Sequence, residues 1–358
     1  MMALAQSGQA QLIVGTHAVI QEKVVLPKLG LAIIDEQHRF GVAQRLALRH
    51  KTPIDENAGV NTDAEPSENL PVTALEPHML MMSATPIPRT LAMSYYADLN
   101  VSTLDELPPG RTPIVTRLLH ESRRDDVISR IQGQLNQGRQ VYWVCPLIEE
   151  SEAIDLRNAT ETWEELSAVL AQPTIEGQEP PANRVGLLHS KMATQDKKAI
   201  MEAFSMGLLS VLVSTTVIEV GVDVPNAALM VIEHAERFGY AQIHQLRGRV
   251  GRGSADSVCI LMYAEPLSLA AKERLQTLRE TSDGFVIAER DLSLRGPGEL
   301  LGAKQSGDAM LRFVDLQRDA WLIELAQQAA DRLLADHADI VERHLERWLG
   351  SRAEFLKA

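Results

Sequence analysis

The chain has 358 residues, a length that fits two or three domains of ordinary size. Its 45% hydrophobic and 23% charged residues are typical of a globular protein, and 48 acidic against 35 basic residues leave a net charge of −13. This charge excludes a protein that coats nucleic acid by bulk positive potential, but it does not exclude binding through a local basic stripe. The two cysteines, Cys145 and Cys259, are too few for a disulfide scaffold or a zinc site, so we expect buried free thiols.

Short apolar runs, each followed by a polar, helix-like stretch, occur along the chain up to residue 263. Continuous apolar strands between helices predict a parallel sheet that is covered on both faces. These runs are too many for one small sheet, so we expect two α/β units. The predicted strands are residues 11–15, 31–35, 78–84, 141–148, 185–189, 208–214, 227–234 and 258–263.

A proline-rich break separates the two predicted units. Pro108, Pro109 and Pro113 forbid helix and interrupt sheet pairing, so residues 104–115 are predicted to be a linker. Beyond residue 264 the pattern becomes helical, with a Gly/Pro-broken loop at 295–302. The predicted fold class is α/β, with two parallel-sheet lobes followed by a helical hairpin and a helical C-terminal tail. The predicted domains are residues 1–107, 108–263 and 264–358.

Residues 51–77 differ from the rest of the first predicted domain. They hold four prolines, no aromatic residue, and six acidic residues against one lysine. Such a segment cannot bury enough apolar surface to offset its ordering entropy, so we predict a disordered surface insertion. Elsewhere, no segment reaches the roughly 18 consecutive apolar residues of a membrane helix. The first residues also lack a basic leader before an apolar stretch, and we expect a cytoplasmic protein with no membrane partner.

Two carboxylates, Asp35 and Glu36, lie at the end of the apolar run LAIID. The carboxyl edge of a strand is where α/β sheets bind ligands. An aspartate there can hold Mg²⁺ on a nucleotide, mostly through water, and Glu36 beside it could polarise the attacking water. Solvated acids that merely cap a strand are the alternative interpretation.

The string SATPIPRT at residues 83–90 comes directly after the next predicted strand. Ser83 and Thr85 offer small hydroxyl groups, and Pro86 and Pro88 stiffen the backbone beyond them. A rigid hydroxyl turn near a carboxylate pair could sense the state of a nucleotide. An ordinary strand-to-helix turn with a hydroxyl cap is the alternative.

Arginines gather in a stretch without acidic residues between Glu236 and Asp256. Arg249 and Arg252 are three residues apart, which predicts that they share one face of a helical turn. Two guanidinium groups on one face suit the charge that develops on a transferred phosphoryl group. A basic, solvated helix is the alternative. The four arginines of this stretch are Arg237, Arg247, Arg249 and Arg252.

Taken together, these strings resemble the motifs of the superfamily 2 helicases in order and spacing. DEQH (35–38) resembles motif II and SAT (83–85) resembles motif III. Residues 214–225 resemble motif V, and QLRGRVGR (245–252) resembles motif VI. GTHA (15–18) resembles motif Ic, which touches the DNA backbone. The resemblance implies two RecA-like lobes, the first of them incomplete, with ATP and Mg²⁺ as cofactors.

Residues 283–307 limit the resemblance to fewer families of helicases. Their string, DGFVIAERDLSLRGPGELLGAKQSG, is similar to the translocation motif shared by the RecG family and the transcription-repair coupling factor. DEQHRFGVAQR, SATPIPRTLAM, DELPPGRTP and WVCPLIEESE also resemble the RecG family. Members of that family are ATP-dependent DNA helicases that remodel stalled forks and Holliday junctions. We therefore expect branched duplex DNA and single-strand-binding protein as partners, and we expect the protein to be a monomer.

The resemblance implies a role for each residue that matches a family motif. Asp35 would hold Mg²⁺, mostly through water, Glu36 would act on the attacking water, and Arg249 and Arg252 would be arginine fingers. His189, like His244, is interpreted instead as a packed or capping residue. The other implied residues are Gly221, Asp223 and Gln245 for nucleotide binding, Ser83, Thr85, Arg290, Arg295 and Gln305 for coupling, and Thr16, His17, Thr215 and Thr216 for DNA binding.

No lysine of this sequence follows a glycine, so the chain contains no G-x-x-x-x-G-K-[ST] phosphate-binding loop, or P-loop. The family places that loop and a wedge domain before motif Ic. We therefore expect the C-terminal portion of a longer helicase, inactive in ATP hydrolysis by itself. Three other functions stay open: a module that binds DNA or a partner without ATPase activity, a translocase like the coupling factor, and a DNA-independent phosphoryl-transfer enzyme.

Overall fold

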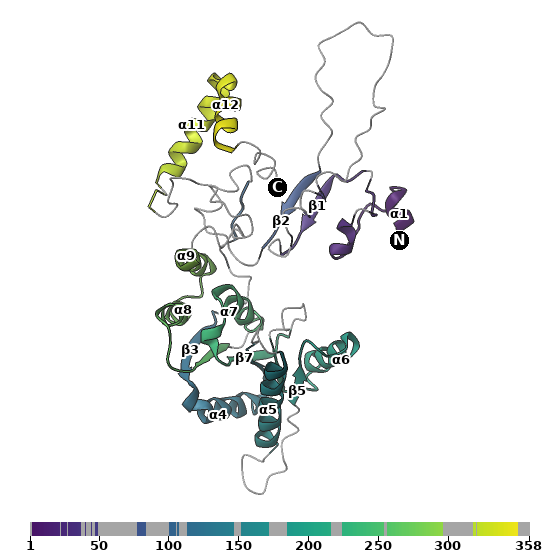
Figure 1. Cartoon of the computed structure of the whole chain (residues 1–358). Coiled ribbons are helices and arrows are strands. Elements are labelled where there is room, and N and C mark those ends of the chain that lie inside the picture. The colour runs from purple at the N-terminus through teal and green to yellow at the C-terminus, as the bar shows by residue number, and fades with distance from the viewer. Residues whose placement is uncertain are drawn as a thin grey trace. The chain divides into compact units, whose positions relative to one another are not determined.

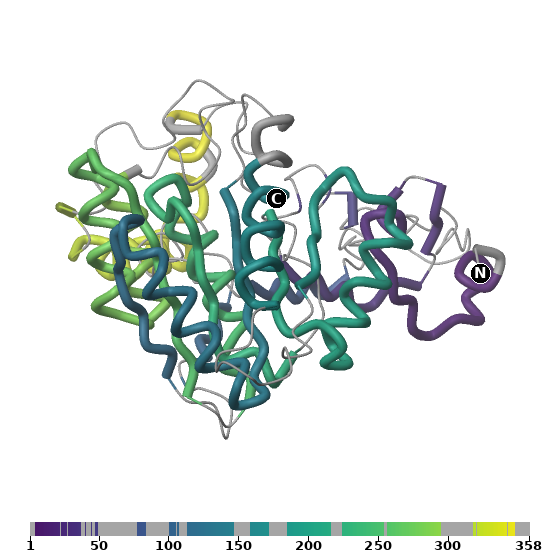
Figure 2. Tube along the Cα trace, turned by 90° about the horizontal axis from the view of Figure 1, so that it is seen from below, coloured from purple at the N-terminus to yellow at the C-terminus, as the bar shows by residue number. Residues whose placement is uncertain are grey.

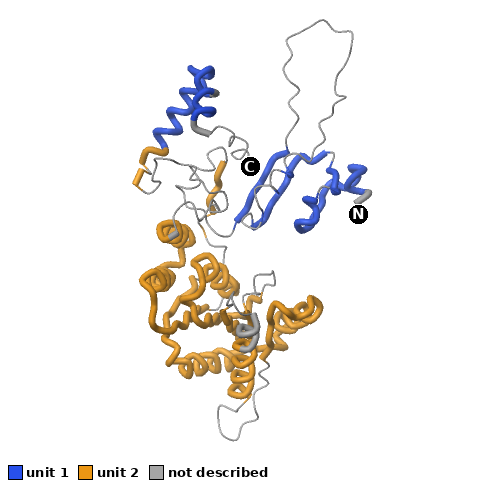
Figure 3. Tube along the Cα trace, viewed as in Figure 1, with its two compact units in different colours: residues 1–84, 324–358 blue, residues 85–323 orange. Residues whose placement is uncertain are grey.

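The computed structural model describes residues 2–36 except 22 and 27, then 40, 44, 47–48, 77–83, 100–106 except 105, 113–146, 152–171, 185–215, 224–253, 256–295, 318–319 and 321–349. The chain forms two compact units, coloured separately in Figure 3. Residues 1–84 and 324–358 form the first unit, and residues 85–323 form the second. The predicted insertion at 51–77 lies outside the described residues, apart from Pro77. The three predicted domain ranges stay predictions.

A six-stranded, wholly parallel sheet forms the centre of the second unit, with the strand order β3-β8-β7-β4-β6-β5 (Figure 1). Parallel strands need crossover connections, and among the described residues helices lie between successive strands of this sheet except between β6 and β7. The strands are β3 (Val115–His120), β4 (Gln140–Val144), β5 (Val185–Leu188), β6 (Val211–Ser214), β7 (Ala227–Ile232) and β8 (Val258–Tyr263).

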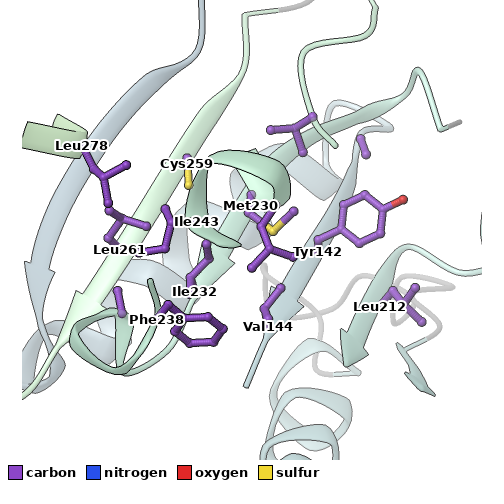
Figure 4. Close-up of a cluster of buried hydrophobic side chains, with 14 of the residues drawn as sticks. Tyr142, Val144, Leu212, Met230, Ile232, Phe238, Ile243, Cys259, Leu261 and Leu278 are labelled. Atoms are coloured by element: carbon purple, nitrogen blue, oxygen red, sulfur yellow. The ribbon is translucent and has the colours of Figure 1, made fainter. Parts of the chain in front are cut away.

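Both faces of this sheet are apolar at its centre, because alternate residues of a strand point to opposite faces and all residues of β4, β6 and β7 are buried. Val141 and Trp143 of β4 pack with α4 and α5. Tyr142 and Val144 belong to the opposite cluster, which Figure 4 shows and to which α6, α7, α8 and α9 contribute. Helices accordingly flank the strands on both sides (Figures 1 and 2). The helices are α4 (Arg124–Leu135), α5 (Glu152–Leu170), α6 (Thr194–Ser205), α7 (Tyr240–Arg247), α8 (Leu269–Glu280) and α9 (Gly284–Arg295).

The predicted helical hairpin corresponds to α8 and α9. Ser268 caps the start of α8, since its hydroxyl accepts a hydrogen bond from the Ala271 amide at 3.1 Å. Leu275 and Leu278 are buried on the inner face of α8, as their helical spacing predicts. Leu269, which the same periodicity placed with them, is 88% exposed because the buried stripe instead begins at Ala271.

In the first unit the described strands are β1 (Leu31–Ile34) and β2 (His78–Met81), which pair in parallel. Ala32 and Ile34 are buried on one face of this pair. On the opposite face Ile33 lies beside Leu80 in the register, and these side chains are 57% and 48% exposed. The unit also contains α1 (Met2–Gln6), η1 (His17–Ile20), most of α11 (Leu322–Asp336), and α12 (Ala338–Leu349).

The sequence-based strand assignment was wrong at one segment and missed another. Residues 11–15 form no strand, and Leu12 and Val14 are 81% and 87% exposed, because nothing among the described residues pairs with this apolar run. Conversely, β3 was not predicted. It is an edge strand in which Thr116 and Arg117 interrupt the apolar character that marks the buried strands.

Candidate nucleotide and nucleic-acid sites

The predicted magnesium and water residues lie directly after β1. Asp35 is exposed, and its Oδ1 accepts a hydrogen bond from the Glu36 amide at 2.9 Å. Glu36 has a φ of +52°, a left-handed conformation that is unfavourable for a residue with a side chain. Strained backbone of this kind is found preferentially at functional sites. The chain thus turns sharply at the point where the sequence predicts a nucleotide site.

The predicted motif Ic turn is packed against the segment that comes after Glu36. The His17 ring stacks on the Phe40 ring, with centroids 4.4 Å apart and planes 9° apart. A Cβ atom at Gly15 would overlap Cγ2 of Val19, so a larger residue there would force the Val19 side chain to shift. Thr16 and His17 are both exposed. Two of the predicted DNA contacts therefore lie near the predicted nucleotide site within the same unit.

Ser83 comes after β2, and the amide of the preceding Met82 donates to the Ile34 carbonyl at 2.8 Å, which extends the pairing with β1. The Ser83 side chain is half-buried. Since Asp35 is next to Ile34 in the chain, motifs II and III lie at the same end of this two-stranded sheet. Thr85 lies outside the described residues.

Thr215 occupies the equivalent position after β6 in the second unit. Its amide donates to the Leu188 carbonyl at 3.2 Å, and its side chain is only 2% exposed. Its Oγ1 has no hydrogen-bond partner in the part of the chain that the structure describes. The other motif V residues predicted here, Thr216, Gly221 and Asp223, lie outside the described residues.

Two of the motif VI arginines, Arg249 and Arg252, lie beyond the end of α7 rather than on it. The helix ends at Arg247, and Gly251 has a φ of +75°, which a helix does not contain. The prediction that Arg249 and Arg252 share a helical face was therefore wrong. Arg249 is half-buried, and Arg252 is exposed, with its Nε 3.3 Å from the Gly248 carbonyl oxygen.

Gln245, the third predicted residue of this motif, is half-buried near the end of α7. The helix is fixed at its other end by Gln242, whose Oε1 accepts the Gly239 amide at 3.0 Å. Arg290 is exposed on α9 and Arg295 is the last residue of that helix, whereas Gln305 lies outside the described residues.

Arg247 is a structurally important residue to which the sequence alone assigned no role. It is only 3% exposed, and its Nη1 donates to the carbonyl oxygens of Leu278 at 3.2 Å and Thr281 at 2.9 Å. Its Nη2 lies 3.1 Å from Nδ1 of His244. Burial lowers the pKa of Arg247. Its guanidinium group thereby joins the motif VI helix to the last turn of α8. Its spacing from Tyr240 and Ile243 on the buried face of α7 was the signal that could have revealed it.

A second link runs between the loop before α7 and the hairpin. Arg274 of α8 donates to the Glu236 carbonyl at 2.5 Å, and the Glu236 carboxylate accepts the Ala264 amide at 3.4 Å. The same carboxylate lies 3.2 Å from Nδ1 of His234, and this hydrogen bond raises the pKa of His234. His234 has a φ of +47°. Two independent links therefore tie α8 to the segment that leads into motif VI.

A third polar cluster, also not predicted, lies at the carboxyl ends of β4 and β7. Arg124 at the start of α4 pairs with Glu233 and with Glu165, the latter at 2.8 Å, and its guanidinium group lies 4.8 Å from the Trp143 ring centroid. Burial disfavours the charged arginine, but the two carboxylates outweigh it and raise the pKa of Arg124. The thiol of Cys145 donates to Glu233 at 3.3 Å, and burial raises its pKa. Both cysteines are buried free thiols, as predicted.

No group of three or more potential metal ligands occurs among the described residues. Mg²⁺ usually keeps several waters and takes only one or two protein carboxylates together with substrate phosphates. One exposed carboxylate at the end of a parallel strand, as at Asp35, fits that mode of binding. The described residues also include no helix that is long and apolar enough to cross a membrane.

The six-stranded parallel sheet with helices on both faces is a RecA-like fold. Residues 124–254 match the family "Helicase conserved C-terminal domain", and residues 281–348 match "ATP-dependent DNA helicase RecG, domain 3, C-terminal". The chain is 50% identical over 353 residues to a RecG helicase of Escherichia coli K12 and 49% identical over 354 residues to one of Haemophilus influenzae. Nearly the whole chain is therefore similar to RecG helicases.

These matches cover 98% and 99% of this chain but 47% of each relative, so the chain spans about half the length of the curated relatives it matches. A solved structure, "Structure of RecG bound to three-way DNA junction", is 39% identical and has a TM-score of 0.61. That match covers 90% of this chain and 37% of the solved chain. The α/β class with parallel, RecA-like sheets and a helical region after them is confirmed.

Proposed function

We propose that this chain is the part of a RecG-type, ATP-dependent DNA helicase that carries motifs Ic to VI and the translocation motif. Such an enzyme couples ATP hydrolysis to movement on duplex DNA and remodels stalled forks and Holliday junctions. The observation that carries the proposal is 50% identity to a RecG helicase over 98% of the chain, together with the RecG-specific match at 281–348. In the solved relative the bound nucleic acid is a three-way DNA junction.

ATP and Mg²⁺ are the proposed cofactors. Asp35 would hold Mg²⁺ through water, and Glu36 would orient and polarise the attacking water. Bound Mg²⁺ would supply neutralisation of the phosphate charge. Gly221, Asp223 and Gln245 are proposed to contact the nucleotide. Arg249 and Arg252 are proposed to stabilise the charge of the transferred phosphoryl group, a contribution of about 10³–10⁵ in rate in related enzymes.

Motion would pass from the nucleotide to DNA through the helical hairpin α8–α9. The buried guanidinium of Arg247 and the bond from Arg274 to Glu236 support this proposal, since both tie α8 to the motif VI segment. The residues proposed for coupling are Ser83, Thr85, Arg290, Arg295 and Gln305, and those proposed for DNA contact are Thr16, His17, Thr215 and Thr216.

A second candidate is a DNA- or partner-binding module without ATPase activity. The missing G-x-x-x-x-G-K-[ST] string favours it for this chain by itself, because the P-loop backbone and lysine form the cradle for the phosphates. We therefore propose that the chain alone hydrolyses no ATP. A cytoplasmic location, a monomeric state and an interaction with single-strand-binding protein belong to the same proposal.

A chimaera tests the helicase assignment. This chain replaces the matching segment of the Escherichia coli relative, and ATP turnover and three-way-junction unwinding are measured on one preparation. We expect both activities, and we expect Arg252→Ala to lower ATP turnover by about 10³-fold or more. Arg237→Ala, which removes an arginine proposed for no role in the reaction, is the matched control.

The proposal requires junction unwinding that depends on Arg252. A chimaera that folds and binds the junction but neither turns over ATP nor unwinds would favour the binding-module function. Turnover without any dependence on DNA would instead favour a phosphoryl-transfer enzyme of another kind.

A further inference from the structure

The Glu233 carboxylate, directly after β7, has no part in the proposed reaction, yet both of its oxygen atoms accept hydrogen bonds. Arg124 at the start of α4 donates to Oε1, and the Cys145 thiol donates to Oε2 at 3.3 Å. The Glu233 amide donates to the Val144 carbonyl at 2.9 Å, which extends the pairing of β7 with β4. The Glu233 side chain is only 13% exposed. Glu233 is therefore fixed through both its backbone and its side chain.

Arg124 is in turn held by the helices on this face of the sheet. Its Nη2 lies 2.8 Å and its Nε 3.1 Å from Oε2 of Glu165 on α5. Its guanidinium group lies 4.8 Å from the centroid of the Trp143 ring, and α4 contacts both β4 and β7. Because a guanidinium group is a rigid, planar fork, one arginine can hold two carboxylates in a defined geometry. The Arg124–Glu233 ion pair therefore anchors the end of β7 to α4 and α5.

Glu233 lies where the chain crosses from one face of the sheet to the other. It contacts Cys145, a member of the buried cluster that α4 and α5 cover. Ile232 and Tyr240 belong to the opposite cluster, which Figure 4 shows. Between them His234 has a φ of +47°, and the chain turns there before α7 begins at Tyr240. A shift of Glu233 would therefore move the turn that leads through α7 into motif VI.

We infer that the Arg124–Glu233 ion pair positions motif VI for phosphoryl transfer. The pair fixes the turn between β7 and α7, so that Arg249 and Arg252 are held where the proposed function requires them. The inference rests on that proposed function. It gives a role to two residues that contact neither the nucleotide nor DNA in the proposal. A misplacement of reacting groups by about 1 Å can lower a rate by about 100-fold, so a fixed turn has a measurable value for turnover.

The test must separate positioning from stability, and a double variant does so. Arg124→Met alone leaves the Glu233 carboxylate without its cation, and it is expected to lower the melting temperature of the chain by about 6–20 °C. Arg124→Met combined with Glu233→Met removes both charges. Replacement of a buried ion pair by apolar residues often leaves stability unchanged, so the double variant is expected to melt close to the unmodified chain.

ATP turnover of the double variant is then measured in the chimaera with the Escherichia coli relative. We expect kcat to fall by about 10–100-fold and KM for ATP to stay within about twofold, because the arginines act on the transition state. Binding of the three-way junction is expected to be unchanged. Arg123→Met is the matched control: Arg123 is the adjacent residue, its side chain is 56% exposed, and it pairs with Asp126 on the surface at 2.7 Å. It is expected to change neither kcat nor KM.

A second readout needs no activity. In the chain alone, amide hydrogen exchange of α7 is expected to be faster in the double variant, whereas exchange of α6 is expected to be unchanged. Glu233→Gln, which keeps the shape of the side chain, replaces the double variant in both measurements if that variant is unstable. It is expected to lower kcat by a smaller factor, again without a change in KM.

A double variant that regains both stability and turnover would show that the pair is only structural, and the inference would fail. A rise in KM with kcat unchanged would overturn it as well, since the pair would then serve nucleotide binding. If the unmodified chimaera turns over no ATP, the proposed function fails. Exchange in the chain alone then still decides whether the pair fixes the turn: faster exchange of α7 supports this, and unchanged exchange contradicts it.

Discussion

The two parallel sheets of this protein differ in how completely they are covered. In the six-stranded sheet, β4, β6 and β7 are buried at every position, and helices cover both faces. In the two-stranded sheet, Leu31 and Ile33 of β1 and Leu80 of β2 are about half exposed. The two-stranded sheet carries predicted nucleotide-site residues, Asp35 and Glu36, after β1, and the six-stranded sheet carries a predicted DNA contact, Thr215, after β6. A unit can therefore carry predicted site residues even where its described sheet is not buried on both faces.

Parallel sheets are normally buried on both faces, because the crossover helices lie there. The second unit satisfies that rule with its own residues, whereas the described part of the first unit leaves an apolar face in solvent. We therefore expect the second unit to account for most of the stability of this chain. Experiments can test this contrast, and the largest effect is expected in the exchange of backbone amides.

Amide hydrogen exchange should separate the two sheets most strongly. Amides of β4 and β7 should exchange only through global unfolding, which costs about 5–15 kcal/mol in ordinary domains. Amides of β1 and β2 should exchange through much smaller local openings. Exchange followed by mass spectrometry measures both in one sample, and equal protection of the two sheets would contradict the contrast.

Matched isoleucine truncations should show the same contrast in stability. Ile232→Ala in β7 removes a fully buried side chain and should lower the free energy of unfolding by about 2–5 kcal/mol. Ile33→Ala in β1, where the side chain is 57% exposed, should change it by less than about 0.5 kcal/mol. Urea unfolding followed by circular dichroism measures both. A loss at Ile33 as large as that at Ile232 would show that the β1 face is covered in solution.

Arg247→Met should lower the free energy of unfolding by about 1–3 kcal/mol, since it leaves the buried carbonyl groups of Leu278 and Thr281 without a donor. Arg237→Met is the control, because Arg237 is 49% exposed and its ion pair with Glu236 is 4.0 Å long. Thermal melts of both variants make the comparison. Equal small shifts would mean that the link between motif VI and α8 contributes little to stability.

The smallest effect should come from the His234–Glu236 pair. Since the pKa of His234 is raised in the folded state, its stabilising contribution is complete below about pH 6.5 and is lost as the pH rises through the folded pKa. The His234 side chain is 37% exposed, so the contribution should stay below about 1 kcal/mol. His234→Asn, which tolerates the left-handed backbone, should melt lower than the original chain only on the acid side of this range. A difference that grows towards alkaline pH would contradict the assigned sign.

Most of the sheet of the second unit could be predicted from apolar runs, since a strand that is buried on both faces consists almost entirely of apolar residues. The same rule failed at β3, where Arg117 lies on an edge strand, and at residues 11–15, where an apolar run has no pairing partner among the described residues. Hydrophobic periodicity shows that a segment has apolar side chains to bury. It does not show whether another segment pairs with it or covers it.

The candidate site residues could be predicted from motifs, but their supporting contacts could not. Arg124 and Glu233 are 109 positions apart in sequence, and Arg247 and Thr281 are 34 apart, so only the fold brings them together. The spacing of Arg249 and Arg252 predicted a shared helical face, yet the glycines between and beside them end the helix first. Short sequence motifs identified the candidate site residues. The backbone conformation that positions these residues depends on tertiary packing, which the motifs do not encode.

The most direct test of the proposed function is ATP turnover by this chain alone, measured as the concentration of duplex DNA is raised. The chain carries the proposed motor-lobe residues, including Asp35, Glu36 and Arg252, but no P-loop. We predict duplex binding without DNA-stimulated hydrolysis, and no difference in turnover between the chain and its Arg252→Ala variant. Turnover that rises with DNA and disappears in Arg252→Ala would contradict this prediction, because a complete phosphate site would then be present without the loop.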